Sequence, residues 1–83
     1  MIKTIKIVGV GDRRQGTSKT GKAYDFTPVS FCFEKPYVKG FAAATCNVNQ
    51  DCMGDYVPIV NDEKQVVMHE DFRTGAFYID AFM

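Results

Sequence analysis

Residues Arg13–Phe26 read RRQGTSKTGKAYDF, and this stretch decides how the rest of the chain is interpreted. Four cations, two glycines and three hydroxyl residues precede Tyr24 and Phe26, which open a run of β-forming residues. A polar, glycine-containing segment before such a run is typical of a hairpin. Cations can follow a phosphate backbone while aromatic rings stack on bases. The stretch therefore predicts a basic β-hairpin wing that binds single-stranded nucleic acid.

The charges of the chain are unevenly distributed along the sequence. The formal net charge is zero, which by itself counts against nucleic acid. Residues 13–39, however, hold six cations against two carboxylates, a net of +4, and the rest holds four cations against eight carboxylates, a net of −4. Such polarity allows a local basic surface on a neutral protein. Ordinary scatter of surface charge is the alternative.

Length and composition limit the class of protein. A chain of 83 residues, 46% hydrophobic with seven Phe and four Tyr, is expected to form one domain over residues 1–83 with a modest core. No long apolar run occurs, so neither a signal peptide nor a membrane span is expected. Three cysteines without a framework spacing favour reduced thiols in a cytoplasm.

The spacing of apolar residues and of Gly and Pro predicts an all-β fold, a small closed or nearly closed barrel. The expected strands are Ile2–Val10, Lys22–Phe33, Phe41–Val48, Asp55–Val60, Val66–His69 and the end of Phe72–Met83. Asn49–Gly54 is expected as a loop, and Thr74-Gly75 as a turn. Within the second strand, Tyr24 and Phe26 have the opposite parity to Phe31 and Phe33, so a bulge or kink is expected at Thr27-Pro28.

Several motifs together carry a family resemblance. SKTGKAYDF follows an Ile-rich strand and RRQGT, and the opening MIK, an EKP turn and GDYVP occur in order. The chain resembles the small single-stranded-DNA-binding, helix-destabilising proteins of filamentous bacteriophages, often called the gene-five type. The resemblance implies a five-stranded oligonucleotide-binding (OB) barrel with a protruding wing and a homodimer. It also implies a non-enzymatic protein that coats the viral strand cooperatively in the bacterial host cytoplasm during replication.

The resemblance and the chemistry together nominate the nucleic-acid-binding residues. The expected phosphate contacts are Arg13, Arg14, Lys19, Lys22, Lys39 and, from the resemblance alone, Arg73. The expected rings are Tyr24, Phe26 and Phe33 and, from the resemblance alone, Tyr37 and Phe41. Core packing is the alternative for Phe26 and Phe33. Phe77 is one candidate for the aromatic residue of the family's dimer-linked loop.

Other chemistry is weakly represented in the sequence. Cys46, Cys52 and His69 lack a fourth zinc ligand and a recognisable spacing, and no residue orients a Cys-His pair. No catalytic residue, metal, cofactor or small-molecule substrate is therefore expected. A small β-barrel that binds RNA or another protein remains the alternative function.

Overall fold

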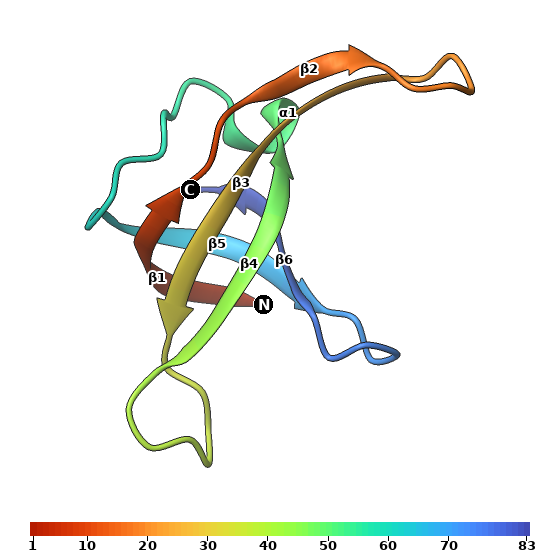
Figure 1. Cartoon of the computed structure of the whole chain (residues 1–83). Coiled ribbons are helices and arrows are strands. Elements are labelled where there is room, and N and C mark those ends of the chain that lie inside the picture. The colour runs from red at the N-terminus through yellow and green to blue at the C-terminus, as the bar shows by residue number, and fades with distance from the viewer.

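The computed structural model describes residues 1–83 and contains six strands and one short helix (Figure 1). In chain order these are β1 (Ile2–Val10), β2 (Arg14–Thr17), β3 (Ala23–Phe33), β4 (Ala42–Asn49), α1 (Gln50–Met53), β5 (Glu63–Glu70) and β6 (Phe77–Phe82). Every strand pair is antiparallel. The all-β expectation is confirmed. The one helix, α1, has four residues, too few to span a membrane.

The strands form one strongly curled sheet. Its order is β2-β3-β1-β5-β6, and β4 pairs with the second edge of β3. The outer edges of β4 and β6 approach each other, and residues of the two strands are in contact. No ladder joins these two edges. The expectation of a five-stranded barrel is therefore corrected in two respects. The sheet has six strands, because the wing adds β2, and it is not closed into a barrel.

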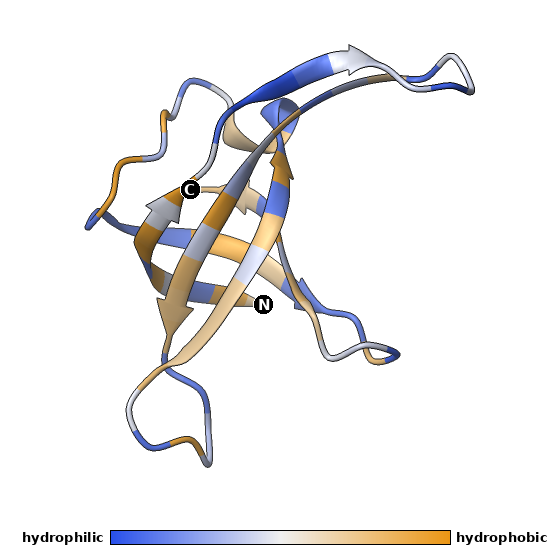
Figure 2. Ribbon diagram, in the orientation of Figure 1, coloured by the Kyte–Doolittle hydropathy of each residue, from blue (hydrophilic) through white to orange (hydrophobic).

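The core lies on the concave side of the sheet, where alternate residues of most strands point inward. Its buried members are Ile5, Ile7, Val29, Phe31, Phe33, Cys46, Val48, Met53, Val66, Met68 and Ile79. Figure 2 shows these strands as orange bands separated by polar positions. The helix α1 replaces part of the loop expected at Asn49–Gly54, and it contributes the buried Met53 to the core.

The strand β3 keeps one alternation along its length, so the bulge expected at Thr27-Pro28 is wrong. Its register with β4 is unbroken from Phe26↔Asn49 to Phe33↔Ala42, and the irregularity lies instead in β1, between Ile7 and Gly9. The Pro28 carbonyl accepts a hydrogen bond from the Gly11 amide at 2.8 Å. The Pro28 nitrogen points to that same side, where β1 has ended and β2 has not begun. The missing N–H of proline therefore costs no ladder bond.

The segment Asp55–Val60, expected as a strand, is irregular. The edge of β1 beside it is occupied at Ile7, which bonds to Asn61 and Asp62 instead. Tyr56 fixes the segment from within, because its hydroxyl donates to Asp62 at 2.6 Å and its ring lies 4.9 Å from that of Phe82. The segment pairs with no strand, so its β-propensity is not used.

Candidate nucleic-acid interface

The wing is the hairpin of β2 with the first residues of β3, and it projects from the body of the sheet (Figure 1). Its register runs from Arg14↔Phe26 to Thr17↔Ala23. The Ser18 amide donates to the Lys22 carbonyl at 2.8 Å, and Gly21 has a φ of 84°. Glycine adopts this left-handed conformation without strain, as a three-residue hairpin loop requires. The expected hairpin is thus present in the structure.

One face of the wing carries the aromatic rings. Residues directly opposite each other in an antiparallel pair share a face, so Arg14 lies beside Phe26 and Gly16 beside Tyr24. The Tyr24 and Phe26 rings are 5.8 Å apart and tilted by 38°. The Tyr24 residue is 42% exposed, and Phe26 is half-buried. These four residues, Arg14, Gly16, Tyr24 and Phe26, are called the ring face below.

Gly16 has a specific role on the ring face. A Cβ atom at this position would lie 2.6 Å from the Tyr24 hydroxyl oxygen and 2.8 Å from its Cζ. The hydroxyl end of the Tyr24 ring therefore lies directly over the Gly16 backbone. Any larger residue at position 16 has to displace the ring.

The opposite face of the wing is occupied by an ion pair. The Arg13 Nε and Nη2 atoms donate to the two Asp25 carboxylate oxygens at 2.8 and 2.6 Å, and the Gln15 amide donates to Asp25 at 3.3 Å. The hydrogen bond from Arg13 lowers the pKa of Asp25, and the same bond raises the pKa of Arg13. Arg13, expected as a phosphate contact, is therefore engaged within the protein. These three residues, Arg13, Gln15 and Asp25, are called the paired face below.

The other three wing cations are available. Arg14 lies on the ring face, Lys19 in the hairpin loop and Lys22 at its end. All three are exposed, and none forms an ion pair in the structure. Three of the four expected wing cations can therefore meet a phosphate without breaking an existing bond.

The ring face continues onto the outer face of the β3–β4 ribbon. Pro28, Ser30 and Cys32 follow Phe26 on β3, opposite Asn47, Thr45 and Ala43 of β4. The Ser30 and Thr45 hydroxyls are hydrogen-bonded at 2.9 Å.

Phe41, 65% exposed, immediately precedes β4 at the far end of this ribbon. At a rise of roughly 3.3 Å per residue, it lies about 25 Å along the ribbon from Phe26. The face thus has rings at both ends and an uncharged polar middle.

Phe33 does not belong to this surface, which corrects its nomination as a stacking ring. It is only 2% exposed, and its ring packs against Phe31 at 5.8 Å and edge-on against Phe77 at 4.9 Å. Because side chains alternate along a strand, the neighbouring Cys32 takes the outer position. Phe77 is itself half-buried beneath the Lys35 ammonium at 5.0 Å, so it is no exposed loop ring.

The remaining nominated residues lie on loops away from the wing. Tyr37, Lys39 and Phe41 belong to the exposed β3–β4 connection, at the opposite end of β3 from the wing. Arg73 lies in the β5–β6 hairpin, which leaves the body in a third direction (Figure 1). The structure therefore brings Arg14, Tyr24 and Phe26 together but not Arg73.

Sequence reasoning missed three features of potential binding surfaces. Phe72 is 93% exposed at the tip of the β5–β6 hairpin, beside Arg73. Asn47 and Asn49 are exposed on the outer face of β4. Parity within Phe41–Val48 could have placed Asn47 outside, because Cys46 and Val48 supply the apolar positions. Phe72 could have been found as the large apolar residue two positions before the Thr74-Gly75 turn.

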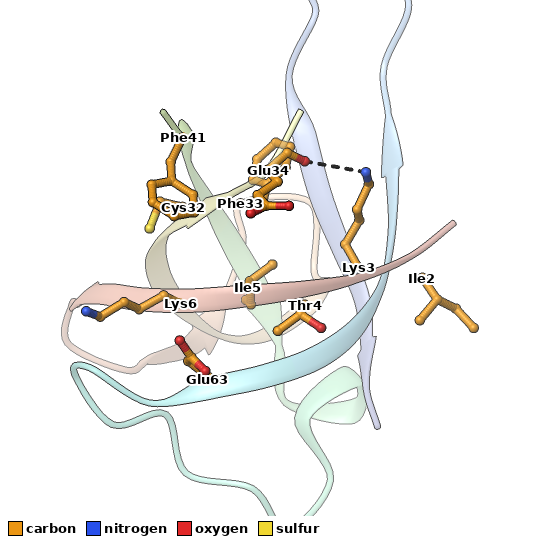
Figure 3. Close-up of a pocket in the computed structure, with 10 residues that line it drawn as sticks. All are labelled: Ile2, Lys3, Thr4, Ile5, Lys6, Cys32, Phe33, Glu34, Phe41 and Glu63. Atoms are coloured by element: carbon orange, nitrogen blue, oxygen red, sulfur yellow. Dashed lines mark hydrogen bonds between the residues drawn. The ribbon is translucent and has the colours of Figure 1, made fainter. Parts of the chain in front are cut away.

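The largest groove of the molecule lies near Phe41, beside the first half of β1 (Figure 3). Its volume is about 560 Å³, and its charged lining residues are Lys3, Lys6, Glu34 and Glu63. The Lys3 ammonium donates to the Glu34 backbone carbonyl at 3.4 Å. Two cations and two carboxylates give this groove no excess charge, so its electrostatics do not favour an anion.

A smaller hollow lies at the open seam between β4 and β6. The His69 Nδ1 atom is 2.8 Å from both Asp80 oxygens, and the His69 ring stacks on Tyr78 at 5.3 Å. Cys52 lines the same hollow. Its thiol makes no hydrogen bond to His69, so the arrangement lacks the contact that activates a nucleophilic thiol.

Comparison of the chain with protein-family models, curated proteins and solved structures gives no match. The resemblance to filamentous-phage proteins therefore stays a prediction that rests on the wing motifs. The function is therefore inferred from the geometry of the wing and of the β3–β4 ribbon.

Proposed function

We propose that this protein binds single-stranded DNA without sequence preference, through the ring face of the wing and the outer face of the β3–β4 ribbon. The observation that carries the proposal is the placement of Tyr24, Phe26 and Arg14 on one face of a projecting hairpin. A ring that stacks on a base contributes about 1–3 kcal/mol and accepts any base. This placement accounts for affinity without a sequence-specific contact.

Electrostatics supplies the second part of the binding. Arg14, Lys19 and Lys22 are exposed and unpaired, so each can neutralise one phosphate. Each such contact releases condensed counterions and adds about 0.7 to the slope of log affinity against log salt for single strands. Three wing contacts therefore give a slope contribution of roughly 2.

The proposal extends to the fold and the assembly. The curled, open sheet with a wing serves, in our interpretation, as an oligonucleotide-binding barrel, a fold that binds strands on an exposed sheet face. We expect a homodimer that coats a viral strand, because a 9.3 kDa chain with exposed Ile2, Ile59 and Phe72 leaves apolar surface for a second copy. Sedimentation at micromolar concentration tests this, and a single 9.3 kDa species contradicts it.

The function is tested by titrating the protein with oligothymidylate while tyrosine fluorescence is recorded. We expect quenching at low salt that reverses as salt is added, and weaker binding to duplex DNA of equal length. Oligouridylate in parallel distinguishes DNA from RNA. No binding at low salt contradicts the proposal, and equal affinity for duplex contradicts the role of the rings.

Tyr78 provides a matched control for Tyr24. Tyr78 is 38% exposed, close to the 42% of Tyr24, but it lies on β6 and stacks on His69. Tyr24→Ala should weaken binding, whereas Tyr78→Ala should leave it unchanged. Equal losses in the two variants would place the strand elsewhere.

A further inference from the structure

The paired face of the wing carries a carboxylate, which the ring face lacks. Asp25 stands next to Tyr24 in the sequence but on the other side of the hairpin, where it accepts two hydrogen bonds from Arg13. The adjacent residues Arg13 and Arg14 thus lie on opposite faces of the hairpin, and only Arg13 forms an ion pair. The guanidinium of Arg13 is held in a fork at 2.8 and 2.6 Å, whereas that of Arg14 forms no ion pair.

This geometry makes Arg13 a poor phosphate ligand. A carboxylate fork uses the same parallel N–H groups with which arginine holds a phosphate, so the two anions compete for one site. The pair is exposed, which means that the competition takes place in water and can be won by either anion. Asp25 has the advantage of being held by the hairpin diagonally across from Arg13, and its own negative charge repels an approaching phosphate.

We propose that Asp25 is a specificity-determining residue that keeps Arg13 off the phosphate backbone and confines the strand to the ring face of the wing. The inference rests on the proposed function. It implies that the wing binds phosphate with three cations although its sequence contains four. A single strand then lies with its bases toward Tyr24 and Phe26 and cannot cross to the other face of the hairpin.

A double-mutant cycle on Arg13 and Asp25 tests the inference, with the salt dependence of oligothymidylate binding as the measurement. Asp25→Asn removes the charge with little change in shape. It should release Arg13 and steepen the salt slope by about 0.7. When salt is lowered from 1 M to 50 mM, the affinity of the variant should therefore rise about eightfold more than that of the wild-type chain. Arg13→Ala should leave the slope unchanged in the wild-type background and should abolish the gain in the Asp25→Asn background.

Arg14→Ala is the matched control, because it removes the neighbouring cation from the ring face. It should lower the slope by about 0.7 whether residue 25 is Asp or Asn. The proposal is overturned if Arg13→Ala lowers the wild-type slope as Arg14→Ala does. It is also overturned if Asp25→Asn weakens or does not change binding while amide hydrogen exchange shows the hairpin intact.

The Arg13→Ala measurement decides the matter even if Asp25→Asn loosens the hairpin, since it needs no change at position 25. A different result would contradict the proposed function. If the wild-type chain binds no oligothymidylate at low salt, both proposals fall. If it binds and Arg13→Ala alters the slope, only the role of Asp25 is contradicted.

Discussion

The strand β3 runs through the body and the wing, and the side chains on its two faces have different surroundings in each region. In the body, its odd-numbered residues Val29, Phe31 and Phe33 are buried against the other strands. In the wing, nothing covers the odd side, and that side carries the charged Asp25 in an ion pair. The rings Tyr24 and Phe26 lie on the even side instead. One continuous strand thus supplies the core at one end and, in the function that we propose, the binding surface at the other.

The difference shows that burial, and not residue type, separates a ring of the core from a ring that is accessible to a ligand. Phe26 and Phe33 lie on the same strand, and both follow a short polar or small residue. Only their parity and the presence of a covering sheet distinguish them. Substitutions in the body should therefore act on stability, and those in the wing on binding.

The largest expected effect concerns the body. Phe31 is fully buried, so Phe31→Ala should lower the free energy of unfolding by about 3–5 kcal/mol through lost burial and a cavity. Tyr24→Ala should change it little, because the wing packs against no core. Urea denaturation followed by circular dichroism measures both. A comparable loss in the two variants would mean that the wing is part of the cooperative core.

The next effect concerns binding by the ring face. Tyr24→Ala should weaken oligothymidylate binding by about 1–3 kcal/mol, because one base loses its stacking partner. The salt slope should stay the same, since no phosphate contact is removed. Titrations at several salt concentrations separate the two quantities. A flatter slope in Tyr24→Ala would indicate that the variant disturbs the cations and not only the ring.

A smaller loss of binding affinity is expected when a side chain is added at Gly16, beneath the Tyr24 ring. Gly16→Ala places a methyl group within 2.6 Å of the present position of the Tyr24 hydroxyl, so the ring has to move away from the wing. Binding should weaken by less than in Tyr24→Ala, because the ring is displaced and not removed. Nuclear Overhauser effects between Tyr24 and Phe26 should weaken in the free variant.

Gln15→Ala is the control for this substitution, since residue 15 neighbours Gly16 but lies on the paired face. It should leave the Tyr24 to Phe26 contacts unchanged. Unaltered ring contacts and affinity in Gly16→Ala would show that the ring does not depend on a glycine beneath it.

The last effect concerns pH and the body. Burial, and then the hydrogen bond to Asp62, raise the pKa of Tyr56 to about 12, above its usual value of 10. The stabilisation is therefore complete below pH 10 and is lost as the pH rises from 10 through 12. The urea midpoint should fall over this range, and Tyr56→Phe should flatten that fall. An equally steep fall in Tyr56→Phe would assign the pH dependence to another group.

Local sequence patterns predicted most of the strands. The strands β1, β3 and β4, the hairpin turn at Thr74-Gly75 and the wing follow from the spacing of apolar residues and from Gly and Pro. The error at Asp55–Val60 has a non-local cause, because the facing edge of β1 at Ile7 bonds to Asn61 and Asp62 instead. The position of Pro28 likewise became clear only from the gap between β1 and β2 beside it.

The candidate site was predictable to a similar extent. Composition indicated Arg14, Tyr24 and Phe26, and the structure places them on one face. Composition did not reveal that Arg13 is paired with Asp25, because the two residues lie 12 positions apart and their contact can be predicted only from the hairpin register. Phe33 was misplaced because the family motif, a ring after a cysteine, was followed in preference to strand parity.

The central claim is that a single strand lies on the ring face of the wing, and an NMR titration with a short oligothymidylate tests it most directly. The account predicts that the ring protons of Tyr24 and Phe26 shift most, with intermolecular Overhauser effects to thymine. Gln15 and Asp25 on the paired face should show no such contacts. Intermolecular contacts at Gln15 and Asp25, or shifts confined to the body of the sheet, would contradict it.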